Sequence, residues 1–290
     1  MTSFSYDAMT TRNRGFVSEA EQARLRASRV FIPGVGGMGG AAFMALVRAG
    51  VGRFVIADID VFEVSNLNRQ LFCRADTIGE LKAEAARRLA LEINPEAEIE
   101  VLGREWTERL PQILPKVDVA INGTDDAAAG AELYRQARTH GRTLIDAYAS
   151  PLPSVTVVRP QDPRIEERLG YPTVGVDWRD ITRDMGVACL MKEIEYVLVH
   201  SSSHKYVDLD VAGEVASGKR SRFSFATMVT MAGTLMAEEA IRVILTRPGG
   251  TDCRGYFFNP HASRVERPMP APLAFAKRML VRQFMTRLLA

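Results

Sequence analysis

Cysteine is scarce in this sequence, and no two cysteines form a C-x-x-C pair. The chain of 290 residues contains three cysteines, Cys73, Cys189 and Cys253, at wide spacing. An odd number of distant cysteines excludes a disulfide scaffold, and a cysteine-built zinc site needs closely spaced pairs. The four histidines also lack metal-ligand spacing, so we predict neither kind of site.

Long apolar runs and a strong net charge are missing as well. No stretch of about 18 apolar residues occurs, and the N-terminus MTSFSYDAMTTRNRG has no apolar signal-peptide core. Thirty-seven Lys and Arg residues against 35 Asp and Glu residues leave a net charge of +2, too small for a global nucleic-acid footprint. We therefore expect a soluble, cytoplasmic protein that binds no nucleic acid and no membrane.

What is present is an average globular composition, 47% hydrophobic, in which short apolar runs alternate with segments of helical composition. Residues 29–33 predict a strand, the glycine cluster after them a tight turn before a helix over 41–49, and 54–58 a second strand. Such a βαβ unit favours a parallel sheet. Further along, we predict helices over 82–93, from 127 to about His140 and over 225–245, and strands over 98–102, 117–122, 143–149 and 256–259.

The glycines follow the pattern Gly34-x-Gly36-x-x-Gly39 between the first strand and the first helix. Backbone N–H groups and the helix dipole can hold phosphate at such a turn, and Asp58 ends the next strand, where an acid meets a nucleotide ribose. The pattern predicts a nucleotide site without choosing between a nicotinamide cofactor and ATP. The alternative is that the glycines only close a tight turn.

A dense polar cluster follows Asp58 and favours ATP. Asn66, Arg69 and Gln70 lie within a few residues of one another, and Lys82 begins the next predicted helix. A triphosphate needs a fork of cationic donors, whereas hydride transfer does not. A solvated charged face is the alternative interpretation of the same residues.

An acidic pair follows the strand predicted over 117–122. Asp125 stands where open α/β sheets bind ligands, at the carboxyl end of a strand. Beside a triphosphate, such a carboxylate is a Mg²⁺ ligand, since Mg²⁺ takes one or two carboxylates plus phosphate oxygens. The alternative is that Asp125 or Asp126 caps the following helix. We predict the metal role for Asp125.

The combination GVGGMG, ADIDVFEVSNLNRQ, Lys82 after Gly79, Asn94-Pro95 and NGTDD resembles the ThiF/MoeB/HesA adenylyltransferases, bacterial relatives of ubiquitin-activating enzymes. The resemblance is strong over residues 11 to 150 and weaker over the 225–245 helix. It implies a Rossmann-like, doubly wound α/β fold, with a mainly parallel sheet, helices on both faces and an irregular crossover segment. It also implies that ATP and Mg²⁺ convert a carboxylate, commonly the C-terminus of a ubiquitin-like sulfur carrier or a peptide, into an acyl-adenylate with release of pyrophosphate.

The resemblance also assigns roles to single residues. Arg14 matches an arginine that reaches across a homodimer into the partner's triphosphate site. The catalytic candidates are Arg14, Asn66, Arg69, Lys82 and Asp125, with Asp125 as the Mg²⁺ ligand. The expected nucleotide-binding residues are Gly34, Gly36, Gly37, Gly39, Asp58, Asp60, Ser65, Asn66, Arg69, Gln70, Lys82, Asp125 and Asp126.

Two departures from the family bear on chemistry. Several relatives bind structural zinc through two C-x-x-C pairs, which this chain lacks, so we predict no zinc. Some relatives pass the activated carboxyl to a cysteine, and Cys189 falls where such a residue could lie. Its apolar neighbours in Val187-Ala-Cys-Leu-Met191 favour a buried, inert thiol over a thioester-forming one.

We predict five parts of the chain: an N-terminal arm and helix over 1–28, a nucleotide-binding domain over 29–159, an irregular crossover or substrate segment over 160–222, a C-terminal helix and strands of the same domain over 223–267, and a basic amphipathic tail helix over 268–290. We expect the tail helix to dock on its own protein or dimer mate rather than on a membrane. The predicted function is a homodimeric, ATP- and Mg²⁺-dependent adenylyltransferase. The alternatives are an NAD-dependent dehydrogenase and a non-catalytic subunit of an activating complex.

Overall fold

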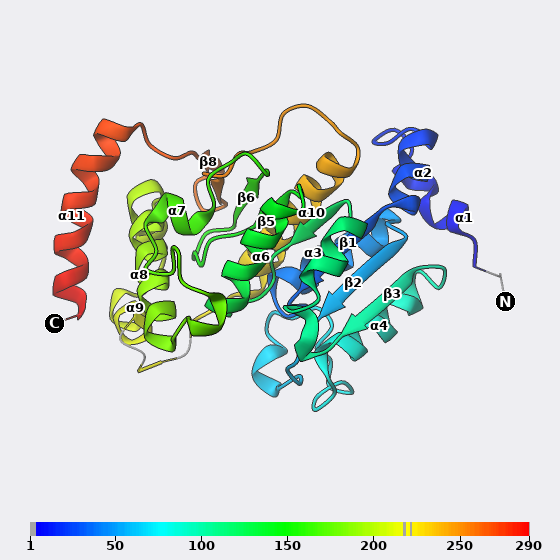
Figure 1. Cartoon of the computed structure of the whole chain (residues 1–290), viewed down its shortest axis with the longest axis horizontal. Helices are drawn as coiled ribbons and strands as arrows, with labels where there is room; N and C mark the ends of the chain where they lie inside the picture. The colour runs from blue at the N-terminus through cyan, green and yellow to red at the C-terminus, as the bar shows by residue number, and fades with distance from the viewer. Residues whose placement is uncertain (1–3, 217–218, 221, 290) are drawn as a thin grey trace.

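The computed structural model describes residues 4–216, 219–220 and 222–289, and its centre is one eight-stranded sheet (Figure 1). The strand order is β3-β2-β1-β4-β5-β6-β7-β8. The strands are β1 Arg29–Pro33, β2 Arg53–Ala57, β3 Glu98–Leu102, β4 Val119–Ile121, β5 Leu144–Asp146, β6 Ser154–Val158, β7 Tyr256–Asn259 and β8 Arg264–Glu266. The first five strands along the chain pair in parallel, and the last three pair antiparallel. The predicted Rossmann-like α/β fold is confirmed.

Helices follow most of these strands. The α-helices are α1 Tyr6–Thr10, α2 Glu19–Ala27, α3 Met38–Ala49, α4 Lys82–Ile93, α5 Leu110–Ile113, α6 Ala127–Thr139, α7 Ile165–Leu169, α8 Arg183–His200, α9 Leu209–Ala216, α10 Ala226–Ile244 and α11 Ala271–Leu289. Short 3₁₀ helices are η1 Thr11–Asn13, η2 Val64–Asn66, η3 Arg104–Trp106, η4 Leu114–Lys116, η5 Trp178–Asp180 and η6 Ser203–Tyr206.

The core lies on both faces of the sheet because side chains alternate along each strand. On β1, Val30 and Ile32 belong to one buried cluster, with residues of α3, α4 and α10. Phe31 between them belongs to the other, with residues of α5 and α6. The helices α3 and α10 approach closely at Gly233, where a Cβ would lie 2.9 Å from the backbone nitrogen of Ala42. The doubly wound arrangement therefore follows from strands that are apolar on both faces.

The segment 160–222 differs from the irregular crossover we predicted, because it contains α7, α8 and α9. The 18-residue α8 shows no single apolar face in the sequence. Tyr196 packs with Tyr148 and Phe257, while Val199 packs with α11 on another side. A helix covered from several sides carries apolar residues around its circumference, which hides the helical period.

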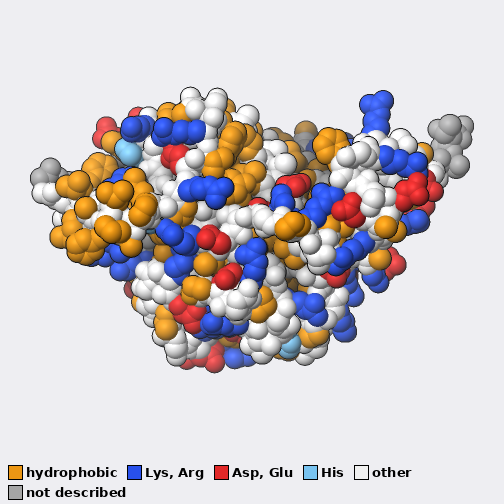
Figure 2. All heavy atoms as spheres, turned by 90° about the horizontal axis from the view of Figure 1, so that it is seen from above, with side chains coloured by type: hydrophobic (Ala, Val, Ile, Leu, Met, Phe, Trp, Pro, Cys, Tyr) orange, Lys and Arg blue, Asp and Glu red, His pale blue; other side chains and the backbone are white. Residues whose placement is uncertain are grey.

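The tail forms the predicted helix, and it packs on its own chain. Ala274 and Val281 of α11 contact Val199 of α8, and Arg282 Nε lies 3.0 Å from a carboxylate oxygen of Glu195. The apolar residues of this amphipathic helix do not all pack against the protein: Leu280, for example, is 68% exposed. Figure 2 shows apolar side chains gathered at the end of the molecule where α11 lies. Among the described helices, none is long and apolar enough to cross a bilayer.

Candidate active site

The site is organised by two backbone turns that touch each other. Gly34 adopts φ +84°, and a Cβ on it would overlap the backbone of Gly123 in the turn after β4. The Gly34 N–H donates to the Ala57 carbonyl at 2.6 Å. Because β1 lies between β2 and β4, these turns meet at the topological switch point, where open α/β sheets bind their ligands.

Asp58 connects the glycine turn to the end of β2 through hydrogen bonds. One carboxylate oxygen accepts the Val35 N–H at 3.0 Å, and the other accepts the Asp60 N–H at 3.1 Å. Burial raises the pKa of Asp58, and the two backbone donors act in the opposite direction. The carboxylate is therefore held in one orientation at the edge of the turn. Gly36 and Gly37 line the cleft described below, whereas Gly39 is buried within α3.

The predicted polar cluster is folded around η2. The Asn66 carboxamide oxygen accepts the Glu63 N–H at 3.2 Å, and Arg69 donates to the Ser65 carbonyl at 2.9 Å. Gln70 is buried against Gly36, and its Oε1 has no hydrogen-bond partner among the described residues. These contacts hold Asn66 and Arg69 in place, and they leave one Gln70 oxygen free to accept a donor.

Lys82 lies at the start of α4, where its side chain is only 10% exposed. Its ammonium lies 2.9 Å from Asp60, whose side chain is 66% exposed. The ion pair places the positive charge at the mouth of the site, beside Asp58. Because Asp60 is exposed, a bound anion can compete for Lys82 at modest cost.

The acidic pair after β4 separates into two roles. Asp126 is the N-cap of α6, and its carboxylate accepts the Ala129 N–H at 2.8 Å. Asp125 is exposed and lines the cleft. The capping alternative therefore applies to Asp126, and Asp125 keeps the position expected of a metal ligand. The described residues include no group of three or more His, Cys, Asp or Glu side chains placed to hold a metal ion.

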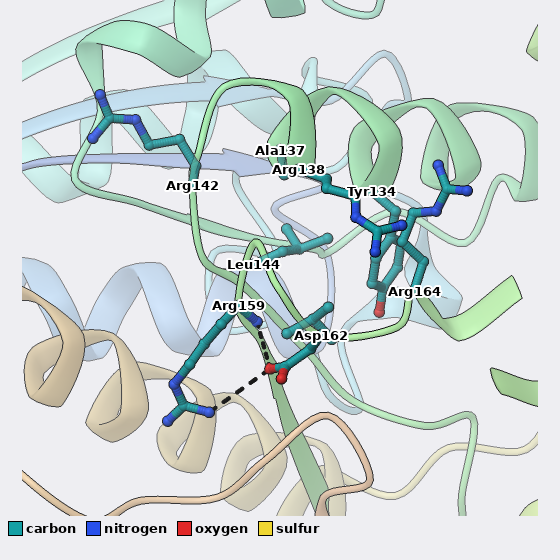
Figure 3. A pocket seen from close by; sticks show the side chains of 9 residues that line it. Tyr134, Ala137, Arg138, Arg142, Leu144, Arg159, Asp162 and Arg164 are labelled. Carbon is teal, nitrogen blue, oxygen red and sulfur yellow. Dashed lines mark hydrogen bonds and ion pairs between the residues drawn. The ribbon is translucent and has the colours of Figure 1, made fainter. Parts of the chain in front are cut away.

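One cleft of about 1410 Å³ brings most of the predicted residues together. Its lining includes Gly34, Gly36, Gly37, Asp58, Asp60, Ser65, Asn66, Arg69, Gln70, Lys82, Asp125 and Asp126. Arg14 is not part of this lining; its side chain is 68% exposed and 3.1 Å from Glu19. A second hollow, of about 10 Å³, lies by Tyr134 and the Arg159–Asp162 ion pair, and has room for about one water molecule (Figure 3).

Cys189 lies outside the cleft lining and is 6% exposed. Burial raises the pKa of its thiol, which disfavours the thiolate needed for nucleophilic attack. The predicted burial of Cys189 is confirmed, and its lack of reactivity stays a prediction.

Two acidic residues near the cleft were not among the predicted site residues. Asp146 ends β5 and accepts hydrogen bonds from Asn122 at 3.0 Å and Tyr134 at 2.6 Å. Glu193 of α8 accepts the Ala149 N–H and lies 3.4 Å from the Tyr171 hydroxyl. Asp146 had a usable signal, since it follows an apolar run as Asp58 does. Glu193 had none, because its role depends on a loop 44 residues away.

The raised pKa of Glu193 predicts that the stability of the protein depends on pH. Desolvation raises its pKa to about 7, and the Asp146 charge acts in the same direction, whereas the Ala149 N–H and Arg222 lower it. Folded protein therefore keeps a proton that the unfolded chain loses above its ordinary pKa of 4.5. The contribution of Glu193 to the free energy of unfolding should therefore fall by about 2–3 kcal/mol as pH rises from about 4.5 to about 7. His200, whose pKa is lowered to about 4 by burial, contributes in the opposite direction, so the quantity to compare is the difference between the wild type and a Glu193 variant.

Glu193→Gln should abolish this decline, because the amide keeps an acceptor for Ala149 without a charge. Urea unfolding at about pH 5 and about pH 8 measures the difference. Glu108→Gln, at an exposed position, is the control and should retain the wild-type slope. An unchanged slope in Glu193→Gln would show that Glu193 is not the responsible group.

Comparison with known proteins places this site in a family. Molybdopterin-synthase adenylyltransferase of Haemophilus influenzae is 35% identical over 116 residues, 40% of this chain and 48% of that protein. The SAMP-activating enzyme E1 of Haloferax volcanii is 37% identical over 125 residues, 43% of this chain and 46% of that protein. These matches span less than half the length of either relative.

Solved structures agree on the fold. MccB of E. coli with ATP superposes with a TM-score of 0.61 at 18% identity, covering 86% of this chain and 66% of that one. The E. coli tRNA N6-threonylcarbamoyladenosine dehydratase TcdA gives a TM-score of 0.58 at 18% identity, covering 83% and 95%. The ThiF family model matches residues 10–278. The chain, with its glycine turn, Asp58 and cationic cluster in one cleft, therefore belongs to the ThiF family.

Proposed function

We propose that this protein is an adenylyltransferase that uses ATP to activate a carboxylate as an acyl-adenylate. The observation that carries the proposal is the cleft, in which the glycine turn and Asp58 lie beside two cations, Arg69 and Lys82, and the carboxylate of Asp125. Relatives named as adenylyltransferases support the same activity. A dehydrogenase would have no use for this set of cations.

The residues fit ATP by shape and by charge. At Gly34 and Gly123 a Cβ would overlap the backbone of the other turn, so glycine at both positions lets the two turns touch beside the cleft. Asp58 would hold the ribose hydroxyls, and the free Gln70 Oε1 supplies an acceptor nearby. Arg69, Lys82 and Asn66 would contact the phosphates. Asp125 would hold Mg²⁺, which screens phosphate charge when bound.

The proposed reaction forms one bond and breaks one. A carboxylate oxygen of the substrate attacks the α-phosphorus of ATP, and the bond from that phosphorus to the bridging oxygen of pyrophosphate breaks. The electron pair leaves with pyrophosphate, so negative charge builds on the departing group. Positioned cations such as Arg69 and Lys82 stabilise that charge, and no side-chain nucleophile is required.

We also propose a homodimer in which Arg14 acts in the partner's cleft. Arg14 is exposed and lies outside the lining of its own cleft. Phe16, two residues later, is 85% exposed, and Val64, Leu67 and Leu81, which are next to cleft-lining residues in the sequence, are also exposed. Exposed apolar side chains on both segments suit burial against a second copy.

The proposal extends to substrate, location and organisation. We propose a ubiquitin-like or sulfur-carrier protein, or a peptide, as the carboxylate, as for the SAMP-activating relative and for MccB, which was solved with N-formylated MccA. We propose a cytoplasmic protein. We further propose that residues 29–159 and 223–267 form the nucleotide-binding domain, with 160–222 contributing to substrate binding.

Asp125→Ala tests the nucleotide assignment. ATP with Mg²⁺ at about 100 times its dissociation constant should stabilise the wild type by about 2.7 kcal/mol. A tenfold weaker affinity in the variant would reduce this to about 1.4 kcal/mol at the same concentration. Thermal unfolding of the wild type and the variant, with ATP in the presence and absence of Mg²⁺ and with NAD, measures these stabilisations.

The matched control is Asp76→Ala, at an exposed acid outside the cleft that pairs with Arg74. It should respond to ATP and Mg²⁺ as the wild type does. If NAD stabilises the protein and ATP does not, the adenylyltransferase proposal is wrong and the dehydrogenase alternative is favoured. Binding of ATP without pyrophosphate exchange on any carboxylate would favour the non-catalytic subunit.

A further inference from the structure

The cleft continues beyond the nucleotide residues into a part with apolar walls. Six residues define this apolar chamber: Leu190, Ile194 and Leu198 of α8, Leu209 and Ala212 of α9, and Phe284 of α11. The chamber and the nucleotide residues line one continuous space. None of the proposed roles of the nucleotide residues uses these side chains.

The α8 wall of the chamber is a stripe rather than a scatter of residues. Leu190, Ile194 and Leu198 are four residues apart, so they project from the same side of the helix. Other sides of α8 are occupied, by the cluster of Tyr196 with Phe257 and by Val199 against α11. The stripe is only half-buried, so the fold leaves an apolar wall partly open to the cleft.

The volume of the cleft and the charges of its lining indicate what kind of ligand the apolar chamber binds. The cleft of about 1410 Å³ exceeds the range of about 300–1000 Å³ typical of a single small-molecule site. The acidic residues among the described lining are all outside the apolar chamber, in the part of the cleft proposed to bind the nucleotide: Asp58, Asp60, Glu63, Asp125 and Asp126. Arg222 lines the cleft near the chamber. A ligand with an apolar body suits the chamber, and its terminal carboxylate would meet the cations Arg69 and Lys82, which line the cleft together with these acids.

The open rim of the chamber favours a peptide over a small carboxylic acid as the ligand. Phe223 and Leu209 line the cleft and are 42% and 38% exposed, so the chamber opens to solvent. A ligand with its carboxylate near the α-phosphate can therefore extend through the chamber and out of the protein.

We infer that the substrate is a peptide or protein whose residues just before the C-terminal carboxylate are aliphatic or aromatic, and that the apolar chamber binds them. This inference rests on the proposed function for the reaction of the carboxylate. It adds a sequence preference that the family relationship does not supply.

Paired synthetic peptides test the inference. The two members differ only in the residues before the C-terminal carboxylate, leucine and valine in one and serine and asparagine in the other. Calorimetry with a non-hydrolysable ATP analogue and Mg²⁺ measures binding. The apolar peptide should bind at least about 10-fold more tightly, because burial of one or two aliphatic side chains accounts for that ratio. Equal binding, weaker binding or no binding of the apolar peptide would overturn the inference.

Pyrophosphate exchange separates the two proposals. An apolar peptide that binds selectively but supports no exchange would contradict the proposed function and leave the ligand preference standing. Exchange that runs equally well with both peptides would support the function and overturn the preference. A C-terminal amide of the apolar peptide should support no exchange, because it lacks the attacking carboxylate.

Variants locate the preference in the chamber. Ile194→Asn should weaken binding of the apolar peptide by about 10-fold and leave ATP affinity unchanged. Phe284→Ser, on a different helix, repeats the test if Ile194→Asn does not fold. Val187→Asn is the control, since Val187 lies on α8, is 49% exposed and does not line the cleft. Wild-type selectivity in folded Ile194→Asn and Phe284→Ser would overturn the assignment.

Discussion

Replacement of Arg69 or Lys82 by alanine should lower the rate of ATP–pyrophosphate exchange by about 10²–10³-fold. Both cations line the cleft beside Asp58, and each would stabilise charge that develops on the departing pyrophosphate. If they act mainly in the transition state, the rate falls more than ATP affinity does. Exchange rates and ATP dissociation constants, measured on the same samples, give both quantities.

Arg74→Ala is the matched control for Arg69→Ala. Arg74 lies in the same loop region, is 52% exposed and pairs with Asp76, but it does not line the cleft. Its exchange rate should equal that of the wild type. Lys82→Ala removes a buried side chain, so its unfolding midpoint is measured beside its exchange rate to show that the variant is folded. Rates within a few-fold of wild type in both cleft variants would contradict the proposed chemistry.

Arg14→Ala should lower the exchange rate by about 10²-fold or more, although Arg14 is outside its own cleft. The reason is that its guanidinium would reach the triphosphate of the partner. A mixing experiment distinguishes this from a local structural effect. Arg14→Ala and Lys82→Ala should each keep at most about a hundredth of the wild-type rate alone, and a mixed dimer carries both defects in one cleft and an intact set in the other.

Random exchange of subunits places about half of the chains in mixed dimers, each with one intact site of two. Activity should therefore recover to about a quarter of the wild-type value. Sedimentation of the mixture confirms that dimers are present. A mixture that stays inactive while dimers form would show that Arg14 does not act across the interface.

The strands and helices that follow local patterns were predictable. The strand over 29–33 and the helix over 82–93 have the predicted bounds in β1 and α4. In both cases the residues within the segment decide the outcome, through an apolar run in β1 and a helical period in α4. The cleft residues Asp58, Lys82 and Asp125 were predictable for a similar reason, because each follows the end of a strand or begins a helix.

Other features depend on contacts between distant segments. The strand β6 was not among the predicted strands, yet all five of its residues are buried, and it lies between β5 and β7. The helix α8 was missed because its neighbours cover it from several sides. The capping role of Asp126 and the free position of Asp125 were indistinguishable in sequence, since either side chain could reach the N–H groups of α6.

The sequence by itself determined the fold class, the family and most of the polar residues that line the cleft, because the glycine turn, Asp58 and the cations are fixed by short-range spacing. Only the tertiary structure decided which residues share the cleft. It excluded Arg14 from its own cleft, buried Cys189, brought Glu193 to the Ala149 loop and left the apolar stripe of α8 open. These outcomes arise from packing between segments far apart in the chain, which no local pattern encodes.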